Sequence, residues 1–178
     1  MGAAYYEDHG AEEYEGHALV IAPVLVSPQA RGRVWLRSSD PADKPRILTN
    51  ALSVAEDVDS LVAGMELARE IAAAQPLASK IVREIKPGPD VSDRESLEED
   101  LRRRLMLIYH PVGTCRMGSD DEAVVDPELR VRGLEGLRVI DASVMPLIPG
   151  GNTNAPTIMI AERAADLIRG RVGAPAAA

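Results

Sequence analysis

Two short segments of the chain each carry a side chain suited to the oxidation of an alcohol. Residues 109–118 read YHPVGTCRMG and contain His110, and residues 151–157 read GNTNAPT and contain Asn154. A neutral imidazole can accept a proton at physiological pH, because the ordinary pKa of histidine is about 6.5. A carboxamide can donate a hydrogen bond to an oxygen, or accept one, without changing its charge. One group could take the hydroxyl proton while the other holds the oxygen. Neither can accept a hydride, so the oxidation would need a cofactor.

These two segments resemble the C-terminal region of the glucose–methanol–choline family of flavoprotein alcohol oxidoreductases. Four further stretches carry the resemblance in the order that the family uses: residues 32–41 (GRVWLRSSDP), 125–131 (VDPELRV), 138–146 (RVIDASVMP) and 158–165 (IMIAERAA). The resemblance extends from about Ser27 to Gly170. The GNTNAPT run is most similar to the choline-dehydrogenase-like and alcohol-dehydrogenase-like branch, which favours a dehydrogenase over an oxidase.

The resemblance implies an FAD-dependent enzyme that oxidises a CH–OH group to a carbonyl, with hydride transfer to flavin N5. In similar enzymes the histidine matching His110 faces the flavin and acts as the base for the hydroxyl, or stabilises the alkoxide. Asn154 would hold the reacting oxygen, although it could instead cap a helix. Asn152 is the alternative cap and the less favoured partner of the oxygen. The residues that match flavin contacts of the family are Asp141, Ala142, Asn154, Ala155, Pro156 and Thr157.

The sequence contains no G-x-G-x-x-G motif, with which such enzymes bind the FAD pyrophosphate at a helix N-terminus. The resemblance therefore implies a catalytic C-terminal portion that contacts FAD only in part. Its expected partners are an alcohol substrate and an N-terminal FAD-binding domain or chain. Two alternatives stay open, namely a truncated or relic fragment without independent activity, and a subunit of a split enzyme.

Composition excludes several other classes of function. The net charge of −8 disfavours nucleic-acid binding, and a single cysteine, Cys115, excludes an internal disulfide. No apolar run approaches the ~20 residues needed to cross a bilayer, and the acidic N-terminus lacks the pattern of a signal peptide. We therefore predict a cytoplasmic chain without a transmembrane segment. His9 and His17 have only scattered carboxylates nearby, so we predict no metal site.

We predict an α+β fold, in which an antiparallel sheet with flanking helices forms part of a substrate domain. Residues 1–17 are interpreted as an acidic leader that is disordered or loosely attached, and residues 18–136 as the substrate-binding portion. Residues 137–170 would return to the FAD domain and supply its last strand and helix. Residues 171–178 would form a flexible tail.

Hydrophobic periodicity predicts the individual elements. Residues 18–26 and 32–37 are expected to form a strand hairpin that turns at residues 27–30. Ser53 and Ser92 are each followed three positions later by Glu, which predicts a capping box for each of two helices. The first helix would end near Ala74, and the second would deliver His110 just past its end.

The last third of the chain is predicted to contain two short strands and a helix. The strands are expected at residues 129–131 and 137–140, on either side of a glycine turn. The helix is expected from about Ala155 to Arg169 and to be closed by Gly170. The apolar face of this helix would comprise Ile158, Ala161, Ala165 and Ile168.

Overall fold

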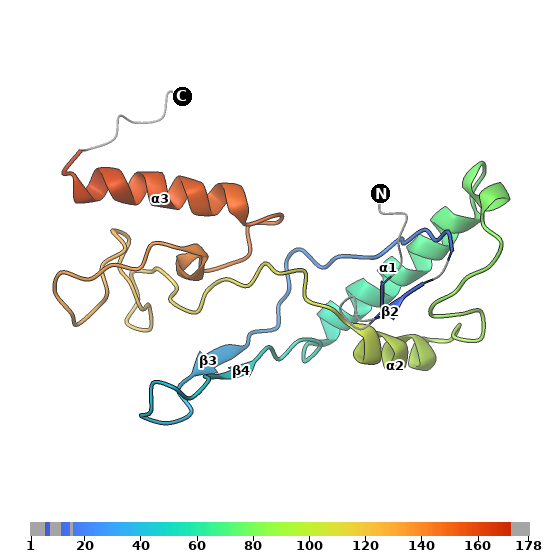
Figure 1. Cartoon of the computed structure of the whole chain (residues 1–178), viewed down its shortest axis with the longest axis horizontal. Coiled ribbons are helices and arrows are strands. Elements are labelled where there is room, and N and C mark those ends of the chain that lie inside the picture. The colour runs from blue at the N-terminus through green and yellow to red at the C-terminus, as the bar shows by residue number, and fades with distance from the viewer. Residues whose placement is uncertain (1–5, 8–11, 15, 172–178) are drawn as a thin grey trace. The chain divides into compact units, whose positions relative to one another are not determined.

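The computed structural model describes residues 6–7, 12–14 and 16–171, which divide between two compact units. Unit 1 contains residues 1–25 and 50–107, and unit 2 contains residues 26–49 and 108–178 (Figure 1). Each unit has its own hydrophobic core. The fold class is α+β, as predicted, with short antiparallel strand pairs and three α-helices among the described residues.

Unit 1 is organised by two helices, α1 (Ala55–Ala73) and α2 (Arg94–Arg104), with a short 3₁₀ helix, η2 (Leu77–Lys80), after α1. Apolar side chains three or four positions apart on each helix form the core between them. The buried members are Val58, Leu61, Val62, Leu97 and Leu101. The segment before residue 25 lies against α1, because a Cβ at Gly64 would be 2.5 Å from the Cβ of Pro23.

The N-terminal strands β1 (Tyr6–Glu7) and β2 (Glu12–Glu13) also belong to unit 1 and pair antiparallel. Most of the predicted acidic leader, at residues 1–5, 8–11 and 15, lies outside the described residues. The predicted tail lies outside them as well, apart from Arg171. The predictions of disorder and of domain boundaries therefore stay predictions.

Both predicted capping boxes are wrong. α1 begins after Val54, which has no side chain able to cap, rather than after Ser53. At α2 the cap is Asp93 instead of Ser92, because the Asp93 Oδ1 atom accepts a hydrogen bond from the Ser96 N–H at 3.0 Å. A carboxylate is at least as good a cap as a hydroxyl, so a start one residue later costs the helix nothing.

α2 also ends earlier than predicted, and residues 105–109 lead to His110 outside any helix. α1 ends at Ala73, in agreement with the prediction.

The cap of α2 makes the stability of unit 1 depend on pH in the acidic range. Hydrogen bonds from the Ser96 N–H and hydroxyl lower the pKa of Asp93 below its usual value of 3.8. The cap therefore stabilises the fold fully above about pH 4, and this contribution is lost as the pH falls through the folded-state pKa. We expect Asp93→Asn, which keeps the acceptor oxygen, to retain the melting temperature at pH 7 and to weaken its fall below pH 4. Thermal melts by circular dichroism across pH 2–7 measure this, and an identical acid profile in the variant would contradict it.

Unit 2 contains the hairpin of β3 (Arg33–Trp35) and β4 (Arg46–Leu48), which pair antiparallel with Val34 opposite Ile47. The Arg33 guanidinium lies over the Trp35 ring, 4.6 Å from its centroid. The prediction that residues 18–26 would be the partner strand is wrong, because that segment forms no strand in the structure and its residues 18–25 belong to unit 1.

The loop between β3 and β4 explains this choice of partner. The Ser38 hydroxyl donates to the Asp43 carboxylate at 2.6 Å, and the Ala42 N–H donates to Asp40 Oδ1 at 2.9 Å. Such side-chain bonds close a local turn, so the nearest downstream segment becomes the partner of β3.

The hairpin leaves no room for a side chain at Gly32. A Cβ there would lie 2.7 Å from the Thr49 carbonyl oxygen and closer still to that of Leu48. Because backbone atoms cannot move aside without breaking the strand pair, Gly32→Ala should destabilise unit 2 by about 1–3 kcal/mol. Amide hydrogen exchange across β3 and β4 measures the loss. Gly151→Ala is the matched control, because its Cβ would meet nothing within 4 Å. Unchanged protection in Gly32→Ala would contradict the prediction.

The core of unit 2 lies between α3 (Asn154–Ile168) and the irregular segments before it (Figure 1). Its buried members are Val125, Leu129, Val144, Met145, Ile160 and Ala164. The strands predicted at residues 129–131 and 137–140 do pair antiparallel, but only as an isolated bridge between Arg130 and Arg138. A short 3₁₀ helix, η3 (Ala142–Val144), follows them.

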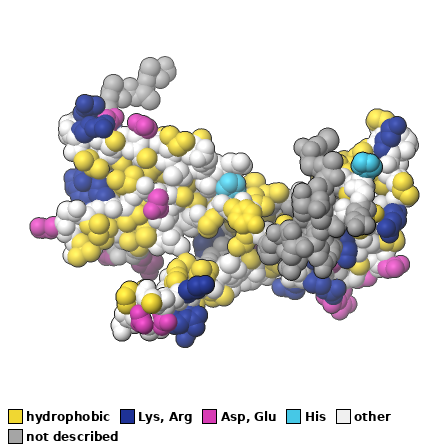
Figure 2. All heavy atoms as spheres, viewed as in Figure 1, with side chains coloured by type: hydrophobic (Ala, Val, Ile, Leu, Met, Phe, Trp, Pro, Cys, Tyr) yellow, Lys and Arg dark blue, Asp and Glu magenta, His cyan; other side chains and the backbone are white. Residues whose placement is uncertain are grey.

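α3 ends at Ile168 and is followed by Gly170 at φ +67°, as predicted. The predicted apolar face is largely exposed, since Ile158 and Ile168 are 55% and 58% exposed, and the helix packs on the core of unit 2 through Ile160 and Ala164 instead. Apolar residues lie on several sides of this helix, so periodicity alone does not select one face. Figure 2 shows hydrophobic side chains at the surface over α3.

Candidate active site

The structure places His110 at the beginning of α3. Its Nδ1 atom lies 3.0 Å from the Oγ1 atom of Thr153, which immediately precedes Asn154 in the chain. The imidazole is half-buried, and Tyr109 before it has a left-handed backbone at φ 62°, which is uncommon for a residue other than glycine. The two segments that sequence analysis selected therefore meet within unit 2.

The loop after His110 is fixed along η3 by its backbone. The Cys115 N–H donates to the Ser143 carbonyl at 3.0 Å, and the Met117 N–H donates to the Val144 carbonyl at 2.8 Å. Gly113, at φ +88°, approaches the same segment, since a Cβ there would lie 3.3 Å from the Met145 carbonyl oxygen. These contacts hold the histidine loop against η3.

Asp141 and Ala142, two of the predicted flavin contacts, begin η3. The Asp141 Oδ1 atom accepts a hydrogen bond from the Ser143 N–H at 2.7 Å, so this carboxylate caps the short helix. Ala142 is half-buried against the core of unit 2.

Asn154, Ala155, Pro156 and Thr157 form the first turn of α3. The N-cap residue is Thr153, so Asn154 is the first helical residue rather than the cap, and it is exposed. The Thr153 carbonyl accepts hydrogen bonds from the N–H and the hydroxyl of Thr157, at 3.0 and 2.7 Å. Among the described residues, the N–H groups of Asn154 and Ala155 have no partner. This end of α3 thus presents two free donors and the positive end of the helix dipole.

An ion pair closes the far end of the histidine loop. The Arg116 guanidinium donates to both carboxylate oxygens of Asp120, at 2.9 and 2.6 Å. Arg116 lowers the pKa of Asp120 well below its usual range, and Asp120 in turn raises the pKa of Arg116. Both groups are therefore charged throughout the physiological pH range.

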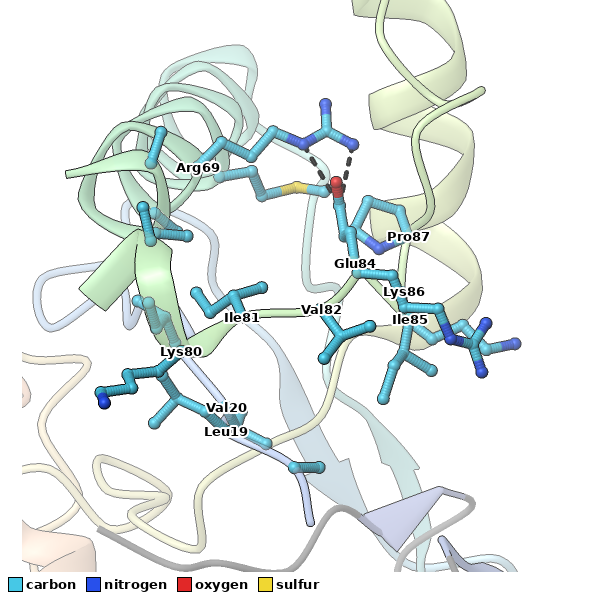
Figure 3. A pocket seen from close by; sticks show the side chains of 18 of the residues that line it. Leu19, Val20, Arg69, Lys80, Ile81, Val82, Glu84, Ile85, Lys86 and Pro87 are labelled. Carbon is cyan, nitrogen blue, oxygen red and sulfur yellow. Dashed lines mark hydrogen bonds and ion pairs between the residues drawn. The ribbon is translucent and has the colours of Figure 1, made fainter. Parts of the chain in front are cut away.

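Unit 1 contains a separate open cavity of about 990 Å³ (Figure 3). Residues 17–23, the C-terminal half of α1 and residues 80–87 line it, and Arg69 and Glu84 point toward one another in its wall with a 2.9 Å ion pair. None of the predicted site residues lines this cavity. Its lining is mainly aliphatic and also includes the imidazole of His17.

Two kinds of site are absent from the described part of the chain. It contains no group of three or more His, Cys, Asp or Glu side chains placed to hold a metal ion. It also contains no helix long and apolar enough to span a membrane.

Comparison with known proteins assigns the family. The model of the C-terminal domain of GMC oxidoreductases matches residues 28–161. An alcohol dehydrogenase (acceptor) from Pseudomonas putida is 48% identical over 164 residues, which are 92% of this chain and 30% of that protein. An oxygen-dependent choline dehydrogenase from Chromohalobacter salexigens is 44% identical over 169 residues, which are 95% of this chain and 30% of that protein.

Solved structures agree with this assignment. A pyridoxine 4-oxidase from Mesorbium loti superposes with a TM-score of 0.77 at 32% identity, covering 83% of this chain and 29% of that one. The chain belongs to the GMC oxidoreductase family, whose members are FAD flavoproteins. It spans about 30% of the length of the curated relatives that it matches.

One residue of the site was missed from sequence. Thr153 contacts His110 directly, yet nothing in its spacing distinguished it from Asn152 and Asn154. The available signal was a threonine three positions before Pro156, because a proline at that position has no N–H to bond the threonine side chain.

Proposed function

We propose that this chain is the C-terminal catalytic portion of an FAD-dependent oxidoreductase that converts an alcohol to a carbonyl. The observation that carries the proposal is the contact between His110 and Thr153, which sets an imidazole beside the free N–H groups of α3. An imidazole and adjacent donors suit a substrate hydroxyl whose oxygen gains negative charge as its proton leaves.

In this proposal His110 accepts the hydroxyl proton, and the exposed carboxamide of Asn154 donates to the same oxygen. Bound FAD would supply the hydride acceptor, at flavin N5. The residues of this chain fit a bound flavin. The positive end of α3, with the free N–H groups of Asn154 and Ala155, favours the negative charge of a reduced flavin near N1 and the C2 carbonyl. Residues Asp141, Ala142, Pro156 and Thr157 would complete the contact.

The proposed partner is an N-terminal FAD-binding domain or chain, corresponding to the part of the relatives that this chain does not match. The exposed apolar side chains of α3 support it. Ile158 and Met159 are 55% and 60% exposed, and exposed apolar surface of this kind commonly marks an interaction site. A separate FAD-binding chain would make this protein a subunit of a split enzyme.

Within the family we favour a dehydrogenase acting on a small alcohol over an oxidase. An alcohol dehydrogenase (acceptor) is 48% identical to the chain, whereas a solved pyridoxine 4-oxidase is 32% identical.

The decisive experiment is anaerobic reduction of the protein assembled with its FAD-binding portion. We expect bleaching of the oxidised flavin and formation of one carbonyl product per flavin with at least one member of a panel of primary and secondary alcohols. The chain without that portion should purify colourless. Stoichiometric FAD on the 178-residue chain would contradict the proposal that a separate portion binds the FAD. An assembled flavoprotein that no alcohol reduces would contradict the proposed activity.

A further inference from the structure

The contact between His110 and Thr153 determines which imidazole nitrogen faces the substrate. Because Nδ1 is 3.0 Å from the Thr153 hydroxyl, Nε2 is the ring nitrogen left for chemistry. A neutral imidazole carries one proton, so the direction of this hydrogen bond decides whether Nε2 is an acceptor or a donor. If the hydroxyl accepts from Nδ1–H, Nε2 is a base. If the hydroxyl donates to Nδ1, Nε2 already carries the proton and can only stabilise an alkoxide.

The first turn of α3 leaves the Thr153 oxygen free to accept. A threonine at the N-cap ordinarily accepts a hydrogen bond from the N–H of the second or third helical residue. Here the third residue is Pro156, which has no N–H, and the Thr153 side chain makes no capping bond. Its lone pairs are therefore not used by its own helix.

The position of Thr153 is fixed independently of its side chain. The N–H and hydroxyl of Thr157 both donate to the Thr153 carbonyl, at 3.0 and 2.7 Å. The backbone of Thr153 is thus held in place by hydrogen bonds, and its hydroxyl contacts the ring of His110.

We propose that Thr153 is a positioning residue, whose Oγ1 atom accepts the Nδ1–H of His110 and thereby keeps Nε2 unprotonated as the proton acceptor. The catalytic use of Nε2 rests on the function proposed above, whereas the direction of the hydrogen bond does not. Pro156 contributes by removing one of the two backbone donors, the N–H of the third helical residue, that could compete for Oγ1.

The test is the tautomer of His110, measured by long-range ¹H–¹⁵N NMR on the 178-residue chain at a pH where the ring is neutral. Free histidine in water favours the Nε2–H tautomer, so a dominant Nδ1–H form in the wild type is a distinctive result. Thr153→Val removes the hydroxyl at nearly constant shape and should shift the tautomer ratio toward Nε2–H by roughly fivefold. Thr153→Ser should retain the wild-type ratio. His17, an exposed histidine of unit 1, serves as the internal reference and should be the same in all three proteins.

A wild-type His110 with its proton on Nε2, or a Thr153→Val variant with an unchanged ratio, would overturn the proposal.

The same variants in the assembled flavoprotein give a second measurement. Thr153→Val should lower kcat for flavin reduction with little change in KM, and Thr153→Ser should restore it. A Ser variant as slow as the Val variant would contradict a role for the hydroxyl. These outcomes are distinguishable from failure of the proposed function, because the tautomer is measured without flavin or alcohol.

Discussion

His110→Ala in the assembled flavoprotein is expected to slow flavin reduction by about 10²–10⁴-fold, the usual contribution of a general base. In the structure the imidazole is held by Thr153 and by a loop whose backbone is bonded to η3, so it is positioned before any substrate arrives. Alanine would leave the hydroxyl proton without an acceptor at that point. Anaerobic stopped-flow measurement of flavin bleaching at saturating alcohol isolates this step from reoxidation.

His17→Ala is the matched control, because His17 is exposed and belongs to unit 1. It should reduce at the wild-type rate. Added imidazole should recover part of the activity of His110→Ala by entering the space that the ring leaves. Reduction of His110→Ala at the wild-type rate would show that another group takes the proton.

Asn154→Ala is expected to lower the same rate by about 10²–10³-fold, which is typical for removal of one donor to a developing oxyanion. Its melting temperature should not change, because Asn154 is exposed and is not the cap of α3. The loss should fall on kcat more than on KM, since the hydrogen bond strengthens as the oxygen becomes negative.

Asn152→Ala distinguishes this role from a general effect of the asparagine-rich turn. Asn152 is also exposed, two positions earlier, and is expected to tolerate alanine with little change in rate. If Asn154→Ala melted early while the rate per folded molecule stayed normal, the residue would be structural. If Asn152→Ala were the slower variant, Asn152 rather than Asn154 would be the residue that holds the reacting oxygen.

The sequence predicted the fold class and the helices well, because their signals are local. The end of α1 and the glycine after α3 follow from hydrophobic periodicity and from the conformational freedom of Gly170 at φ +67°. Helix starts were less predictable, since Ser92 and Asp93 are both good caps and only the backbone geometry selects Asp93.

Local sequence patterns did not predict which distant segments would pair, pack or contact one another. Residues 18–26 resemble a strand in composition, but β3 pairs with β4 because the loop between them closes through Ser38 and Asp43. For α3, several sides of the helix are apolar, so the burial of Ile160 rather than Ile158 is decided by what packs on it. The contact of Thr153 with His110 joins residues far apart in sequence, and no spacing rule predicts such a pair.

The position of Trp35 has a practical consequence for spectroscopy. It is the only tryptophan of the chain, and it lies in β3 beneath the Arg33 guanidinium. Its emission therefore reports on unit 2 alone, whereas far-ultraviolet ellipticity includes the long α1 of unit 1. Denaturation followed simultaneously by both signals separates the two halves of the chain without any added label. Non-coincident midpoints would mean that each half unfolds on its own.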